Sequence, residues 1–211
     1  MSVEAVQILK ALGRSPNVRG LGLDAAAIRM EKDRPATGAT QQTSAPHIFA
    51  AGDVSGPFEI VHIAIQQGEI AARNAARLIE DSAERMEETD YRLKLSVVFS
   101  DPELAVVGRG EAELRAAGIA FRTASYPFND HGKSILMDAN YGYVKVIAEP
   151  QRGRILGAEI VGKDAGELIH AFSGPLAMRA TVFDLLRAPW YHPTLAEIIT
   201  YPLEEIAEKL T

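Results

Sequence analysis

Short apolar segments separated by turn residues fill the second half of the chain, and this pattern restricts the fold more than any other feature. Each segment has the length and composition of a β-strand, and helical patterns follow the last of them. Strands first and helices afterwards predict an α+β fold, in which helices pack on one side of a mainly antiparallel sheet. The expected strands are residues 93–99, 104–107, 120–127, 143–148 and 155–161, and the expected helices begin at residues 111, 164, 183 and 194.

The first half of the chain has less material for a core. Residues 1–45 contain one apolar run followed by turn residues and polar stretches, so they look like the remnant of a domain rather than a whole one. Residues 46–88 contain a pattern typical of a short buried strand, residues 47–51, and then a helical pattern. Because a polar, charged stretch comes next, we place a domain boundary near its end and expect residues 89–211 to fold together.

Composition excludes several classes of function. The 211 residues include 47% hydrophobic and 24% charged residues, which is ordinary for a globular chain. The net charge of −6 comes without clustered Lys and Arg, so we expect no nucleic-acid partner. No apolar run reaches the ~18 residues of a membrane span, and the first residues lack the pattern of a secretory signal. We therefore expect a cytoplasmic protein without a membrane partner.

The absence of cysteine narrows the chemistry further. A chain without cysteine forms no disulfide, no Cys-ligated zinc site and no thiol nucleophile of its own. Its histidines are scattered, without the spacing of metal ligands, so we predict no metal site within this chain.

A Gly-Asp pair at the end of the predicted strand 47–51 is the first candidate site. Gly52 lets a ligand approach the backbone closely, and Asp53 can accept hydrogen bonds from sugar or polyol hydroxyls at the carboxyl end of a strand. The start of the next helix offers free N–H groups to an electron-rich ring edge. A plain strand-to-helix turn is the alternative, but the whole string of residues 43–53 favours ligand binding.

The second candidate site is the string His192-Pro193-Thr194-Leu195-Ala196-Glu197. Thr194 and Glu197 have the spacing of a capping box at a helix start, which needs no catalysis. Alternatively, Glu197 fixes the tautomer of His192 and raises its basicity, so that His192 acts as a general acid and base. The pattern alone favours neither interpretation, and the two roles are compatible.

Five motifs in this order resemble the carboxyl-terminal part of the flavin-dependent pyridine nucleotide-disulfide oxidoreductases, and most closely dihydrolipoamide dehydrogenase and mercuric ion reductase. The resemblance runs from about residue 3 to the end of the chain. It implies that residues 1–45 are the exit from a nicotinamide-binding domain, that residues 46–88 return to an FAD-binding domain, and that residues 89–211 form a homodimer interface. The motifs are residues 13–17, 43–53, 97–103, 153–157 and 192–197.

The resemblance also implies cofactors and residue roles. FAD and NAD(P)H would be the cofactors of the full-length protein. Asp53, next to Gly52, would bind the ribityl chain of FAD, and the helix start with Val61, His62 and Ala64 would face the flavin ring. His62 is alternatively a histidine packed within its helix.

The same resemblance gives the second site a role. His192 and Glu197 would serve the dithiol site of the partner subunit, His192 as acid and base and Glu197 as the residue that orients it. The substrate would be a small-molecule or protein-bound disulfide.

Two family motifs are absent, namely the Gly-x-Gly-x-x-Gly of the first FAD segment and the redox Cys pair. We therefore expect a fragment that neither binds FAD stably nor turns over on its own, and that still dimerises. Two alternatives stay open: a stand-alone dimerisation or regulatory module without catalysis, and part of a mercuric reductase. The lack of a Cys pair near the carboxyl end weighs against the mercuric type.

Overall fold

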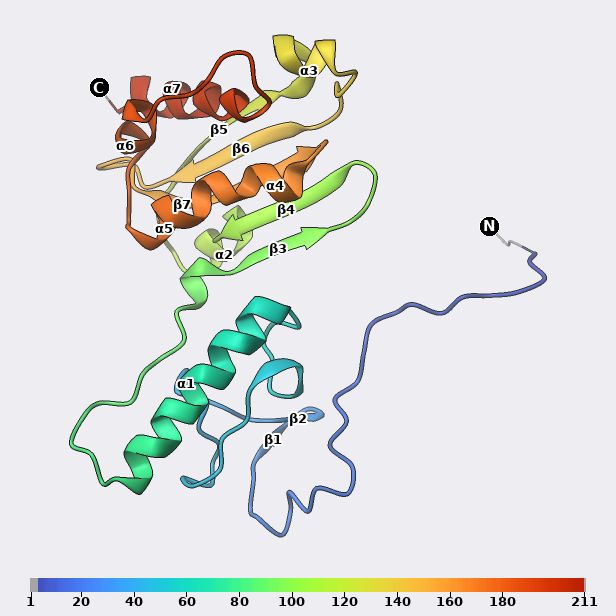
Figure 1. Cartoon of the computed structure of the whole chain (residues 1–211), viewed down its shortest axis with the longest axis vertical. Coiled ribbons are helices and arrows are strands. Elements are labelled where there is room, and N and C mark those ends of the chain that lie inside the picture. The colour runs from blue at the N-terminus through green and yellow to red at the C-terminus, as the bar shows by residue number, and fades with distance from the viewer. Residues whose placement is uncertain (1–3, 211) are drawn as a thin grey trace. The chain divides into compact units, whose positions relative to one another are not determined.

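The computed structural model describes residues 4–210, and the chain divides into two compact units (Figure 1). The first unit ends at Thr89 and the second begins at Asp90. The division follows the polar, charged stretch in which we placed a domain boundary. No helix within the described residues is both long enough and apolar enough to cross a lipid bilayer.

An antiparallel sheet organises the second unit. Its strands are β3 Leu95–Val98, β4 Glu103–Gly108, β5 Arg122–Pro127, β6 Tyr143–Ala148 and β7 Ile155–Gly162. The order across the sheet is β3-β4-β7-β6-β5, and every neighbouring pair is antiparallel. The sheet therefore confirms the fold class, because all of its strands coincide with segments whose composition predicts strands.

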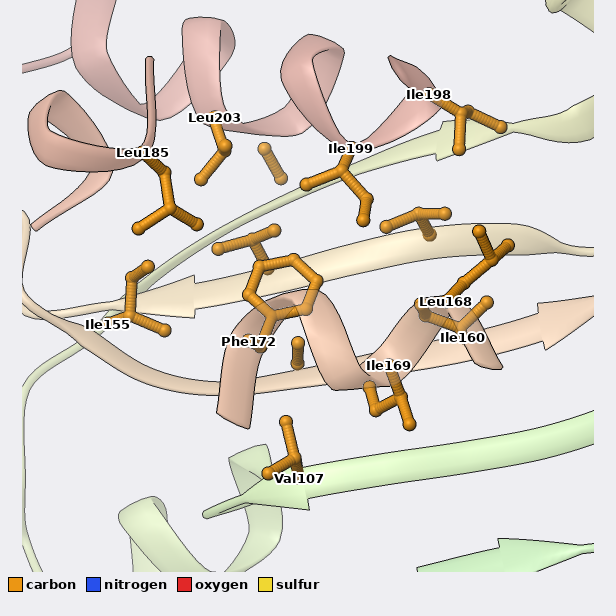
Figure 2. Packing of buried hydrophobic residues seen from close by; sticks show 14 of the residues in the cluster. Val107, Ile155, Ile160, Leu168, Ile169, Phe172, Leu185, Ile198, Ile199 and Leu203 are labelled. Carbon is orange, nitrogen blue, oxygen red and sulfur yellow. The ribbon is translucent and has the colours of Figure 1, made fainter. Parts of the chain in front are cut away.

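Short helices follow the sheet, as the order of patterns predicts. Phe172, at the end of one of them, is fully buried in one apolar cluster with Ile160 of β7 and with Ile199 and Leu203 from the end of the chain (Figure 2). Burying an aromatic side chain of this size contributes about 1.5–3 kcal/mol. The helices are α4 Ala165–Leu168, η4 Ile169–Phe172, α5 Ser173–Ala177, α6 Val182–Arg187, η5 Ala196–Ile199 and α7 Thr200–Glu208.

One further helical segment precedes β3, and three others connect strands of the sheet. They are η2 Tyr91–Leu93, α2 Glu111–Ala116, η3 Phe128–Asp130 and α3 Gly132–Leu136. The helix α2 lies on the other face of the sheet from the apolar cluster. Lys145 of β6 alternates with Val144 and Val146, which belong to that cluster, and its ammonium lies 3.0 Å from the Glu111 carboxylate of α2. The main helical layer thus covers one side, and α2 is the exception.

The first unit contains one long helix and little sheet. The sheet is a hairpin of two short strands, β1 Met30–Glu31 and β2 Arg34–Pro35. A 3-10 turn, η1 Gly52–Val54, comes next, and the long helix α1, Val61–Ile79, follows it. Residues 4–18 form no regular secondary structure. The helical pattern after residue 57 is therefore confirmed.

The prediction of a buried strand at residues 47–51 is wrong. Phe49 makes one isolated antiparallel bridge with Gln42, and the segment is half-buried or exposed. A strand needs a hydrogen-bonded neighbour along its length, and the described part of this unit supplies one residue of pairing here.

Two helix starts also differ from their predictions. Asp164 adopts a left-handed conformation, with φ of +56°, and its side chain makes no capping hydrogen bond, so the expected capping pair with Glu167 does not form. The final helix does not run unbroken from Thr194, because the 3-10 segment η5 comes first and α7 begins at Thr200.

Candidate functional site

The Gly-Asp pair forms the 3-10 turn η1 in front of helix α1. Gly52 has φ of +79°, a conformation that favours glycine. A Cβ atom at Gly52 would lie 3.5 Å from the Cβ atom of Ala64, so the turn and the first turns of the helix are in close contact. The Asp53 carboxylate stays about half exposed, 3.9 Å from the Arg14 guanidinium.

A buried glutamine of α1 fixes this turn, although the sequence pattern did not single it out. Gln67 Oε1 accepts a hydrogen bond from the Gly52 N–H at 2.7 Å, and Gln67 Nε2 donates to the Gly56 carbonyl at 2.9 Å. The Arg34 guanidinium donates to the Asp53 carbonyl at 2.8 Å. Side chains therefore hold the backbone of the turn in one conformation.

The first turn of α1 begins without a side-chain cap. Ile60 precedes the helix and has no polar side chain for the first N–H groups, so their partial positive charge is available to a ligand. Val61 is 76% exposed, His62 is exposed and Ala64 is half-buried. The ring of His62 is therefore not packed inside the described part of the chain.

A cavity of about 270 Å³ lies beside the Asp53 turn. Arg14, Asn17 and Glu59 line it together with Asp53. A cation, an amide and two carboxylates in one wall suit a polar, hydroxyl-bearing ligand better than an apolar one.

The second candidate site contains a hydrogen-bonded histidine and glutamate. His192 Nδ1 lies 2.7 Å from Glu197 Oε2 and 2.9 Å from Oε1. Because an ionised carboxylate only accepts hydrogen bonds, Nδ1 carries the proton and Nε2 is free to take up another. The His192 side chain is 82% exposed, whereas that of Glu197 is 11% exposed. This arrangement can move a proton between Nε2 and a group outside the fold.

The capping-box interpretation of this string is wrong. The 3-10 segment η5 has Leu195 as its N-cap, without a side-chain capping bond. The Thr194 hydroxyl donates instead to the Tyr191 carbonyl at 2.8 Å. The Glu197 carboxylate is engaged by imidazole rings and does not reach back to the start of the segment.

A second histidine on the same carboxylate was missed by sequence reasoning. His131 Nε2 lies 3.2 Å from Glu197 Oε1, and His131 Nδ1 lies 2.7 Å from Ser134 Oγ. His131 is 1% exposed and Ser134 is fully buried. The only local signal was the three-residue spacing of His131 and Ser134, and Glu197 lies far along the sequence from both.

Aromatic rings enclose this buried end of the site. The ring of Tyr201 meets that of His131 edge-on, with centroids 6.1 Å apart, and stacks on Tyr126 at 4.0 Å. Burial, together with a hydrogen bond to Asp130, raises the pKa of Tyr126 to about 12, so its hydroxyl stays protonated. His131 is therefore shielded from solvent, and the carboxylate of Glu197 is its charged neighbour.

Two family descriptions match this chain. Residues 95–202 match the dimerisation domain of the pyridine nucleotide-disulphide oxidoreductases, and residues 1–68 match the pyridine nucleotide-disulphide oxidoreductase description. The first of these ranges contains β3 through η5 and both histidines of the second site.

Individual relatives agree with these matches. Dihydrolipoyl dehydrogenase from Thermus scotoductus is 37% identical over 205 residues, which cover 97% of this chain and 42% of the relative. Dihydrolipoyl dehydrogenase from Halobacterium salinarum is 34% identical over 92% of this chain and 40% of the relative. The crystal structure of LpdA from Mycobacterium tuberculosis superposes with a TM-score of 0.79 at 26% identity, covering 93% of this chain and 42% of LpdA.

The chain thus spans about two fifths of the length of these relatives. The match to residues 95–202 covers more than half of the chain. These residues contain the five-stranded sheet of the second unit and most of its helices. The chain belongs to the pyridine nucleotide-disulphide oxidoreductase family and contains its dimerisation domain.

Proposed function

We propose that this chain is part of an FAD- and NAD(P)H-dependent disulfide oxidoreductase of the dihydrolipoyl dehydrogenase type. The observation that carries the proposal is the His192–Glu197 pair, in which one imidazole nitrogen is held and the other faces outward. The names of the relatives support the type of reaction. In this proposal the second unit supplies a homodimer interface and an acid and base for the thiol chemistry.

His192 would act at its outward nitrogen. Reduction of a disulfide by two electrons yields two thiols and consumes two protons, and Nε2 of His192 would deliver a proton to the leaving sulfur. In the reverse direction the same nitrogen would take the proton from a thiol. Glu197 would hold the Nδ1–H tautomer and stabilise the imidazolium that forms.

The redox disulfide of this proposal lies outside the chain, which contains no cysteine. His192 would therefore reach a dithiol on another segment of the protein or on the partner subunit. The exposed position of its side chain fits such a role, because a residue that serves another surface has to lie at the boundary of its own fold.

The residues of the first unit fit a flavin nucleotide. The half-exposed Asp53 carboxylate is suited to ribityl hydroxyls, and the turn at Gly52 lies close to the start of the helix. The uncapped N–H groups near Val61 and His62 suit an electron-rich ring edge. Ala64 has a small side chain, which leaves room for a ring beside the helix at this point. When bound, FAD would supply two-electron transfer between nicotinamide and disulfide.

Substitution of the outward histidine tests the proposal. In the complete flavoprotein that contains this chain, His192→Ala is expected to lower the rate of disulfide reduction about 10²- to 10⁴-fold. Reduction of the flavin by NAD(P)H is expected to stay at the wild-type rate, since His192 lies at the thiol end. The measurement is stopped-flow absorbance of the flavin beside steady-state turnover.

His170→Ala is the matched control, because His170 is an exposed histidine of the same unit. Unchanged disulfide turnover in the His192 variant would remove it from the reaction. A wild-type protein that reduces no disulfide at all would favour the stand-alone dimerisation module instead.

A further inference from the structure

We propose that His131 is a positioning residue for His192 and acts through the carboxylate of Glu197. The geometry is one hydrogen-bonded chain, Ser134–His131–Glu197–His192, that runs from the interior of the second unit to its surface. That His131 fixes the tautomer of His192 depends only on these hydrogen bonds. That His131 affects catalysis rests on the proposed function.

The hydrogen bonds among these four residues are all satisfied by one set of proton positions. The carboxylate of Glu197 accepts from both rings, so His131 carries its proton on Nε2 and His192 carries its proton on Nδ1. Nδ1 of His131 is then an acceptor, and the Ser134 hydroxyl donates to it at 2.7 Å. Each member fixes the tautomer of the next, which is how an inner residue influences the outer nitrogen of His192.

Burial separates the roles of the two histidines. His131 is 1% exposed and Ser134 is fully buried, whereas the His192 side chain is 82% exposed. His131 therefore touches no group outside the fold and is not itself a catalytic residue. Its contribution is to the place and orientation of the carboxylate.

The carboxylate needs this second anchor because it is nearly buried. Glu197 lies in η5 next to Ile198 and Ile199, which are fully buried in apolar surroundings. A carboxylate in such a place is stabilised by hydrogen bonds to each oxygen, and leaving one unmade is costly. His192 lies on an exposed segment. His131 is a fixed partner, held by Ser134 and the edge of Tyr201.

The test is nuclear magnetic resonance of the 211-residue chain labelled with ¹⁵N-histidine, at a pH about two units above the ordinary imidazole pKa. In the wild type we expect the ring-nitrogen shifts of an Nδ1–H tautomer for His192 and of an Nε2–H tautomer for His131. In His131→Leu we expect the two nitrogen shifts of His192 to move toward a mixture of tautomers. His131→Gln keeps a donor at the place of Nε2 and is expected to restore the wild-type His192 shifts.

Two further variants keep the test decisive. Ser134→Ala leaves the His131 ring in the core and removes only the hydroxyl, so it answers the question if His131→Leu does not fold. In this variant the shifts of both His131 and His192 are expected to move toward mixed tautomers. His170→Leu repeats the substitution on an exposed histidine and is expected to leave His192 unchanged. His192 shifts that stay at wild-type values in both folded His131→Leu and Ser134→Ala would overturn the proposal, as would a failure of His131→Gln to restore them.

Kinetics of the complete flavoprotein give the catalytic part. His131→Leu is expected to lower kcat for disulfide reduction about 10- to 100-fold, with KM for the disulfide and the rate of flavin reduction unchanged and with rescue by His131→Gln. An unchanged kcat would show that the carboxylate needs no second anchor. If the wild type reduces no disulfide, the proposed function fails, and the resonance experiment still decides the role of His131.

Discussion

Each of the two units of this chain is stabilised by a different kind of interaction within itself. In the second unit a continuous apolar cluster joins one face of the sheet to the helices, with Phe172 and Ile199 fully buried within it. In the described part of the first unit the buried apolar side chains are few: Ile28, Ala36, Ala45, Ile63 and Ile70. Its long helix places polar side chains at buried positions between its apolar ones.

Gln67 and Asn74 show what those polar positions do. Gln67 binds the backbone of the Gly52 turn, and Asn74 donates to the carbonyls of Thr40 and Glu87 and accepts from the Glu87 N–H at 2.8 Å. This face of the helix therefore fixes the neighbouring loops by hydrogen bonds rather than by burying apolar surface. One chain therefore uses buried hydrogen-bonding side chains to fix the Gly52 turn and apolar packing to hold its sheet and helices together.

The largest expected effect comes from the apolar core of the second unit. Phe172→Ala is expected to lower the free energy of unfolding of this unit by about 3–5 kcal/mol, since the side chain is fully buried. The chain has a single tryptophan, Trp190, which donates to the Leu185 carbonyl within the second unit. Its fluorescence during urea unfolding therefore reports on that unit.

Met178→Ala is the control for this prediction, because Met178 is 80% exposed and its loss leaves no cavity. A cost below about 1 kcal/mol for Phe172→Ala would contradict the view that apolar packing holds the second unit, since one buried methylene group alone contributes about 0.8 kcal/mol.

An intermediate effect is expected in the first unit. Gln67→Leu keeps the volume of the side chain and removes both hydrogen bonds to the turn, at a cost of about 1–3 kcal/mol. We expect the Gly52 amide to exchange with solvent deuterium about ten to a hundred times faster, because local opening of the turn becomes easier. Gln66→Leu, at an exposed position of the same helix, is the matched control.

If the leucine variant exchanged as slowly as the wild type, the turn would be held by packing after all. The distinction between the two units would then disappear at the Gly52 turn.

The smallest expected effect is at a helix start of the second unit. Thr181 caps α6 by accepting from the Asp184 N–H, while the Asp184 carboxylate accepts from both the hydroxyl and the N–H of Thr181. Thr181→Ala is expected to cost about 1 kcal/mol at neutral pH. Trp190 fluorescence measures this as well.

The pH dependence of that cost sharpens the prediction. The hydrogen bonds from Thr181 lower the pKa of Asp184, so the stabilisation is present above the ordinary aspartate value and is lost as pH falls through the lowered pKa. The difference between Thr181→Ala and the wild type is thus expected to shrink below about pH 4. A difference that grew on acidification would rule out the carboxylate as the partner.

Sequence patterns predicted what depends on local periodicity. The strands of the second unit and helix α1 appear where alternating or helical patterns place them, since those patterns describe which side faces a core. The patterns failed where a tertiary partner decides. Residues 47–51 have a strand composition but only one bridged residue, and Asp164 has the composition of a helix cap but a left-handed backbone.

The candidate sites follow the same rule. The neighbours His192 and Glu197 could be paired from their spacing, and their hydrogen bond is present. The contact between His131 and Glu197 could not be predicted, because the two residues are 66 positions apart in the sequence and meet only in the folded unit. Gln67 was missed for a similar reason: its helix position predicts burial, but not that its amide would bind the Gly52 turn.

The strand order has a consequence for how this chain is made. β4 emerges from the ribosome with β3 as its only available neighbour, and its other edge stays open until β7 has been synthesised, since Glu103 pairs with Gly162. Pairing that waits on distant sequence is slow and leaves hydrogen-bonding edges exposed to other nascent chains. Translation reaches His192 and Glu197 only after the last strand, so the hydrogen bond between them forms after every strand of the sheet has been synthesised.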